Sequence, residues 1–254
     1  MARLSLTSWS LHQDLSNGSL KLTDLPARMR AAGIGTLELC HFHLPDAQPE
    51  TLANMRYAIE AAGVELLSVL IDAGDISNAD PARAAADQRM VESWIDAAAA
   101  LGARGVRVVA GEGATDDRAA LDRAVVGLKN ASVYAASRGI RVRTENFRPL
   151  LATAENCLYL LDRLEGQVGM CADIGNFPRE QRQAAFAAVV GRAEVVHVKA
   201  EYDSNGQIIA DELRGCLDAA RVTGFTGAYT LVYDRGGDSW AGLAQLGEVV
   251  AGYL

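Results

Sequence analysis

The sequence predicts an α/β protein, a (β/α)8 TIM barrel, and three observations carry that prediction. Short β-branched runs alternate with helix-like segments along the whole chain. Three of these runs, in the second half, end on polar residues that are able to do chemistry. The length of 254 residues is usual for one eight-stranded barrel. We therefore expect a single domain spanning residues 1–254.

The repeating unit is an amphipathic helix that ends near a glycine and leads into a short strand. Glycine directly after a helix suits the left-handed C′ position, and it recurs at Gly33, Gly63, Gly102, Gly139 and Gly224. Helices fill the gaps between the strands, and short alternating connections imply parallel strands with right-handed crossovers. Strands are expected near residues 3–9, 35–40, 64–71, 104–110, 140–145, 167–173, 193–199 and 227–233.

Two helix signals are local. Thr23, Asp24, Leu25 and Pro26 read as an N-cap followed by a first turn. The segment 81–101 reads as a helix whose alanine run favours close packing on a strand. An open doubly wound sheet is the alternative fold, but the G-x-G-x-x-G fingerprint that it often carries is absent after the first strand.

Composition limits the classes of function. Half of the residues are hydrophobic, which is enough for a sizeable core, and the formal net charge is −8. An acidic chain disfavours a nucleic-acid partner, because such proteins usually carry a basic patch. Cys40, Cys157, Cys171 and Cys216 lack the spacing of a zinc knuckle or a disulfide framework. With no signal peptide or long apolar span in the sequence, we expect a cytoplasmic protein without a membrane partner.

The candidate site comes from the polar ends of three runs, at residues 141–145, 168–173 and 195–199. Glu145, Asp173 and His197 stand near the carboxyl ends of these successive strands. In a (β/α)8 barrel those ends converge where active sites lie. Carboxylates and imidazole are ligand types for divalent metals, so the pattern predicts a metal-assisted enzyme.

At these strand ends the chain resembles the sugar phosphate isomerase/epimerase family of xylose-isomerase-like TIM barrels. The resemblance covers nearly the whole chain and is carried by the motifs at residues 33–39, 100–108, 139–146, 172–176 and 196–199. It implies a divalent manganese, magnesium, cobalt or zinc ion held by Glu, Asp, His and Glu on strands five to eight. In this sequence, the resemblance implies Glu145, Asp173 and His197 as the metal ligands. It also implies that the strand-five and strand-eight glutamates act as an acid/base pair around an enediolate.

Two positions depart from that pattern. Val232 stands where the strand-eight glutamate belongs, and Asn176 stands where many members have histidine. Asp234 has the same inward parity as Val232 and is an alternative ligand. The metal is therefore in doubt.

Side-chain alternation adds a second reason to doubt the metal. If Glu145 points into the barrel mouth, so does Arg143, one layer deeper. A guanidinium inside a barrel needs anions, so we expect Arg143 to pair with Glu145 or Asp173 and to take over the role of the ion. The alternative is that Arg143 bends outward at a bulge.

The remaining candidates complete the predicted site. His197 is a ligand or proton carrier, and Lys199, on the same face, is a clamp for a carboxylate, phosphate or hydroxyl group. As alternatives, His197 is structural and Lys199 extends into solvent. Further candidates for substrate binding are Trp9 as an apolar wall, Glu38 at the end of strand two, Arg143, Asn176, and Arg235 in the loop after strand eight.

Three functions remain open. The first is an isomerase or epimerase for a small carbohydrate-like substrate, namely a sugar, a sugar phosphate or a hydroxy-keto acid, with Glu145 as the base and His197 or Lys199 stabilising an enediolate. The second is a metal-free, rewired or non-catalytic barrel that binds a sugar. The third, an apurinic endonuclease, is disfavoured because that enzyme needs a histidine-rich three-zinc cluster and this acidic chain has four histidines. Barrels of this family often pair, so a homodimer stays open.

Overall fold

The computed structural model describes residues 2–254, and within them eight parallel strands close into a barrel. Each strand pairs with the next along the chain, and the first pairs with the last. The predicted (β/α)8 TIM barrel is confirmed. Residue 1, where the predicted domain begins, lies outside the described residues. The strands are β1 (Arg3–Thr7), β2 (Thr36–Cys40), β3 (Glu65–Ile71), β4 (Gly105–Val108), β5 (Arg141–Glu145), β6 (Gly169–Asp173), β7 (Ala193–Lys199) and β8 (Ala228–Val232).

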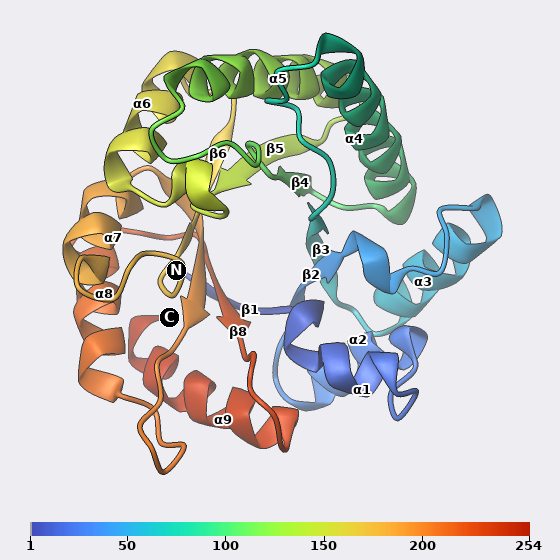
Figure 1. Cartoon of the computed structure of the whole chain (residues 1–254). Helices are drawn as coiled ribbons and strands as arrows, with labels where there is room; N and C mark the ends of the chain where they lie inside the picture. The colour runs from blue at the N-terminus through green and yellow to red at the C-terminus, as the bar shows by residue number, and fades with distance from the viewer. Residues whose placement is uncertain (1) are drawn as a thin grey trace.

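Helices surround the barrel as an outer ring (Figure 1). The helix predicted at residues 81–101 is α4, which begins after the Asp80 side chain caps the amide of Ala82. The helices are α1 (His12–Ser16), α2 (Leu25–Ala31), α3 (Pro49–Ala61), α4 (Pro81–Leu101), α5 (Arg118–Ala136), α6 (Ala154–Leu164), α7 (Arg182–Val190), α8 (Ala210–Val222) and α9 (Ser239–Val250). Within residues 2–254, no helix is both long and apolar enough to cross a bilayer.

The glycines predicted after the helices take the backbone conformation that was expected of them. Gly33, Gly63, Gly102, Gly139 and Gly224 all have φ between 63° and 79°. This left-handed conformation costs glycine little, because it has no Cβ. It turns the chain sharply from each helix back toward the barrel, which keeps the connections before the strands short.

Apolar and ionisable side chains are buried in different places. The main core packs the outer face of the strands against the helices, with side chains such as Leu6, Val142 and Val196 at most 1% exposed. The inside of the barrel instead holds buried charged groups, and such groups need partners because an unpaired buried charge is costly. They are Glu38, Arg107, Arg143, Glu145, Asp173 and His197.

Candidate active site

A cavity of about 330 Å³ opens at the carboxyl end of the barrel. Its floor is polar and includes Arg107, Glu145, Asp173 and His197, which come from β4 to β7. Its rim is partly aromatic and includes Trp9. A pocket of this size with a few convergent polar groups is the expected form of a small-molecule site.

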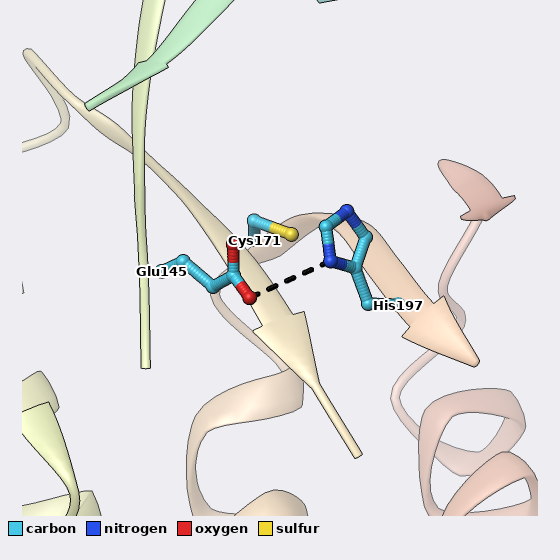
Figure 2. Close-up of side chains that lie close together, drawn as sticks. All are labelled: Glu145, Cys171 and His197. Atoms are coloured by element: carbon cyan, nitrogen blue, oxygen red, sulfur yellow. Dashed lines mark ion pairs between the residues drawn. The ribbon is translucent and has the colours of Figure 1, made fainter. Parts of the chain in front are cut away.

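His197 is the centre of the polar floor. Its Nε2 lies 2.9 Å from Oε2 of Glu38, and the hydroxyl of Thr230 donates to the same oxygen at 2.8 Å. The other ring nitrogen, Nδ1, faces Oε1 of Glu145 at 3.5 Å and Oδ2 of Asp173 at 3.6 Å. Figure 2 shows the ring edge turned toward the carboxylate of Glu145, with the thiol of Cys171 beside it. Glu38 thus orients the ring, and Nδ1 is left facing two carboxylates.

The charges of this cluster shift one another's pKa values. Burial raises the pKa of Glu145, but the charges of Arg107 and His197 outweigh that effect and lower it to about 2. Burial lowers the pKa of His197, but interactions with Cys171, Glu145 and Glu38 outweigh it and raise that pKa well above its usual value. The carboxylates around the ring therefore favour the protonated form of His197.

Asn176 and the turn after β6 fix the two carboxylates that face His197. Oδ1 of Asp173 accepts hydrogen bonds from the amides of Gly175 at 2.6 Å and Asn176 at 3.0 Å. The side-chain amide of Asn176 donates to Oε1 of Glu145 at 3.0 Å. Oδ2 of Asp173 is left facing Nδ1 of His197, and Oε2 of Glu145 is left facing Nε of Arg107.

Arg107 is the residue of this site that the sequence prediction missed. Its Nη1 donates to Oδ1 of Asp72 at 2.7 Å, and its Nε lies 2.9 Å from Oε2 of Glu145. The side chain is 5% exposed and lines the cavity. The alternation that singled out Arg143 on strand five also applies to strand four, and there it would have placed Arg107 on a face opposite to Val106 and Val108.

The predicted pairing of Arg143 with Glu145 or Asp173 is wrong. Arg143 is buried, but its Nε donates to Oε2 of Glu194 at 2.8 Å, and its Nη1 donates to Ser68 at 3.3 Å. Glu194 stands at the start of β7, at the amino end of the barrel. Among the described residues that line the cavity, Arg143 does not appear. This position gives no support to the predicted role of Arg143 in substrate binding. Arg107 instead occupies the inward cationic place that was expected of Arg143.

The other predicted substrate-binding residues divide into two groups. Trp9 and Asn176 line the cavity, and Trp9 is 41% exposed at the rim against Phe42. Glu38 lies behind His197 at 1% exposure, so it orients the histidine rather than facing a ligand. Arg235 stacks over Tyr202 at 4.7 Å and lines a separate, small recess. The predictions for Glu38 and Arg235 as direct substrate contacts are therefore not supported by their positions.

Lys199 lines the cavity and is paired. Its Nζ lies 2.8 Å from Oδ2 of Asp234, and both side chains are about one-third exposed. Its aliphatic stem packs over Gly175, where a Cβ would come within 2.7 Å of the lysine Cδ. Asp234, the alternative to the missing strand-eight ligand, is thus engaged by a cation.

A family model for the xylose isomerase-like TIM barrel matches residues 26–237 of this chain. The chain belongs to this family. The match confirms the resemblance inferred from the strand-end motifs. No curated protein sequence gives a significant match.

Solved structures of this fold superpose on nearly the whole chain. L-ribulose 3-epimerase is 21% identical over 99% of this chain and 94% of its own, with a TM-score of 0.75. D-psicose 3-epimerase, solved in the presence of D-fructose, is 17% identical over 96% and 89%, with a TM-score of 0.73. The IOLI protein, solved with a zinc atom, is 15% identical over 99% of both chains, with a TM-score of 0.79. At these identities the likeness shows a shared fold.

The xylose isomerase-like barrel of this chain has a donor set that fits a divalent cation. When each donor atom lies about 2.1 Å from an ion, neighbouring donor atoms lie about 3.0–3.4 Å apart. The distances from Nδ1 of His197 to the nearest oxygens of Glu145 and Asp173 are close to this. The bond from Nε2 to Glu38 is the outer support that metal-bound histidines usually have. Glu145, Cys171 and His197 also present donor atoms within 4.8 Å of one another. Val232, 6% exposed in the cavity wall, offers no ligand.

Proposed function

We propose that this protein is an isomerase or epimerase of a small carbohydrate or hydroxy-keto acid, acting by proton transfer next to a carbonyl. The family supports this proposal, as does the fold shared with L-ribulose and D-psicose 3-epimerases. A balanced set of charges supports a neutral polyhydroxy substrate, because Arg107 and Lys199 are each already paired with an acid. A homodimer and a cytoplasmic location remain predictions.

The observation that carries the proposal is the position of Glu145. Its carboxylate ends β5 at the cavity floor, with Oε1 held by Asn176 and Oε2 facing Arg107. A general base must lie within hydrogen-bond reach of the proton that it removes. A sugar in this cavity would bring its C–H bonds within reach of the Glu145 carboxylate, so we assign Glu145 as the base.

His197 supplies positive charge beside the oxyanion that forms, and Lys199 binds the substrate farther out. When bound between Glu145, Asp173 and His197, a divalent ion would act as a Lewis acid on the substrate carbonyl. The imidazole of His197 is held by Glu38, and the Glu38 carboxylate is in turn held by the hydroxyl of Thr230. Lys199 and Asp234 stand across the mouth, where they bind and orient hydroxyl groups at the far end of the substrate.

The identity of residue 232 favours isomerisation over epimerisation. The family resemblance assigns proton transfer to glutamates on strands five and eight, and strand eight carries Val232 instead. A single base removes and returns a proton on the same face of an enediolate. Such a base moves the proton between neighbouring carbons, so we expect isomerisation between aldose and ketose to be faster than inversion of one carbon.

A metal-free or non-catalytic sugar-binding barrel is the second candidate. It is favoured by the ion pair between Arg107 and Glu145, which neutralises the carboxylate without a metal. An apurinic endonuclease is less well supported. The histidine-rich cluster that such an enzyme needs has no counterpart within residues 2–254, where His12 and His43 contact each other and His197 faces Glu145 and Asp173.

The test uses protein stripped with a chelator and reloaded separately with Mn²⁺, Mg²⁺, Co²⁺ or Zn²⁺. Each form is incubated with pentoses, hexoses and their phosphates, and the products are separated by chromatography. The proposal expects one sugar class to be converted, with conversion lost on chelation. Heat of sugar binding without conversion in any metal form would favour the second candidate.

A further inference from the structure

An unmatched donor and acceptor face each other in the cavity. Nε of Arg107 and Oε2 of Glu145 are 2.9 Å apart and attract as an ion pair. Their alignment is nevertheless poor, and neither atom has a hydrogen-bond partner among the described residues. Both side chains are at least 95% buried and line the cavity. Buried polar atoms are costly to leave without a partner, so this pair is suited to a ligand that both donates and accepts.

The guanidinium of Arg107 is held in place from behind. Its Nη1 donates to Oδ1 of Asp72 at 2.7 Å and to the carbonyl of Ile71 at 3.3 Å. Its Cζ lies 5.7 Å from the centre of the Phe147 ring. These contacts fix the plane of the group, so Nε stays beside Glu145 at the floor of the cavity. A donor held in this way needs little reorganisation when charge develops nearby.

We propose that Arg107 is a catalytic residue that binds the substrate oxygen on the carbon next to the one that loses its proton. The ligand fragment that fits is an α-hydroxycarbonyl, whose carbonyl accepts from Nε of Arg107 while its neighbouring carbon or hydroxyl faces Oε2 of Glu145. This inference rests on the proposed function and names the group in this chain that receives the developing negative charge.

The step balances without a further reactant. Glu145 takes the proton from the carbon beside the carbonyl, and the C–H electron pair forms the C=C bond of an enediolate. The carbonyl π pair moves to oxygen, which becomes an oxyanion against Nε of Arg107. An arginine suits this place because it stays protonated and binds oxygen without giving up its proton. To give the isomer, the proton of the neighbouring hydroxyl group passes to the oxyanion, the hydroxyl oxygen becomes the new carbonyl oxygen, and the C=C electron pair takes the proton back from Glu145 at the former carbonyl carbon.

The test compares Arg107→Met and Arg107→Lys with Arg143→Met as the matched control. Arg143 is also a buried arginine inside the barrel, but it contacts Glu194 and Ser68 away from the cavity. The probe is glycolohydroxamate, a planar analogue of an enediolate, titrated by calorimetry into protein held in EDTA. We expect Arg107→Met to bind it at least 30-fold more weakly than wild type, Arg107→Lys to bind it with intermediate affinity, and Arg143→Met to bind it as wild type does. Equal affinity in Arg107→Met, or no binding by wild type, overturns the proposal.

Kinetics separate this inference from the proposed function. On a sugar that wild type converts, we expect Arg107→Met to lower kcat at least 100-fold and to raise KM less than 10-fold, because the contact strengthens in the transition state. Unchanged kcat overturns the role of Arg107 and leaves the isomerase proposal standing. Hydroxamate binding that depends on Arg107, in a protein that converts no sugar, supports the role of Arg107 and counts against the sugar reaction.

Discussion

Arg107 and Arg143 occupy paired positions on adjacent strands, and their guanidinium groups serve opposite ends of the barrel. Arg107 reaches the mouth, where it contacts Asp72 and Glu145. Arg143 reaches the amino end, where it contacts Glu194. Two buried cations thus satisfy two separate groups of acids. This division leaves a positive charge at the floor of the active site without any contribution from Arg143.

Glycines make room for the ion pair between Arg143 and Glu194 at the amino end of the barrel. A Cβ on Gly105 would lie 2.5 Å from Nη1 of Arg143 and 2.5 Å from the carbonyl oxygen of Arg141. A Cβ on Gly169 would clash with the carboxyl group of Glu194. The guanidinium of Arg143 lies at the amino end because the neighbouring strands lack side chains there.

Gly105→Ala is therefore expected to destabilise the fold. Overpacking against a backbone oxygen and a buried arginine typically costs about 1–3 kcal/mol. The measurement is the free energy of unfolding in urea. Gly247→Ala in α9 is the matched control, because its Cβ would meet no atom within 4 Å and alanine favours a helix. Equal stability of Gly105→Ala and wild type would contradict the described packing of Arg143.

Glu145→Gln tests the assigned base. The amide has nearly the same shape but cannot take a proton, so we expect kcat to fall by about 10²–10⁴-fold. The circular dichroism spectrum should match that of wild type. Glu60→Gln on α3, where the side chain is exposed and paired with Arg56, should keep wild-type activity. A Glu145→Gln variant with a wild-type rate removes this residue from the mechanism.

The stability of the metal-free protein should peak between about pH 4.5 and pH 6.5. Glu145 has its pKa lowered from 4.5 to about 2, so its contribution is present above pH 4.5 and is lost as the pH falls toward 2. His197 has its pKa raised above 6.5, so its contribution is present below pH 6.5 and is lost as the pH rises through the folded-state pKa.

Unfolding free energies measured from pH 2 to pH 8 in EDTA check this profile. On the acid side, wild type should lose about 3 kcal/mol more than Glu145→Gln, from the shift in the pKa of Glu145. Parallel curves for the two proteins would show that Glu145 is not ionised against Arg107 and His197 in the folded state.

Val232→Glu should strengthen metal binding. Residue 232 lines the cavity on β8 beside Lys199 of β7, and a carboxylate there would add a fourth donor near Glu145, Asp173 and His197. We expect Mn²⁺ affinity, measured by calorimetry, to rise at least 10-fold, an additional anion being worth about 1.4 kcal/mol or more in a buried site. Val232→Gln is the isosteric control without the charge. Weaker or equal Mn²⁺ binding by Val232→Glu would place the cation elsewhere.

The sequence predicted the strands well because each is a local pattern. The strand expected near residues 104–110 is β4 at Gly105–Val108, and the strand expected near residues 140–145 is β5 at Arg141–Glu145. The convergence of Glu145, Asp173 and His197 follows from topology, since parallel strands end at one face.

The partner of a long buried side chain was harder to predict. Alternation shows that Arg143 points inward, but its end is placed by Gly105 and Glu194 on other strands. Arg107 depends in the same way on Asp72, which lies in a loop just after β3. Contacts of this kind arise from three-dimensional neighbours that no local pattern in one sequence reveals.

Solvent deuterium incorporation tests the central claim most directly. Wild-type protein loaded with Mn²⁺ is incubated in D₂O with ketopentoses and ketohexoses, and the sugars are followed by proton NMR. The account predicts deuterium at a carbon next to the carbonyl of one sugar, and loss of that exchange in Glu145→Gln. Exchange that persists in Glu145→Gln, or no exchange with any of these sugars in the presence of Mn²⁺, Mg²⁺, Co²⁺ or Zn²⁺, would contradict proton transfer by Glu145 at the mouth of this barrel.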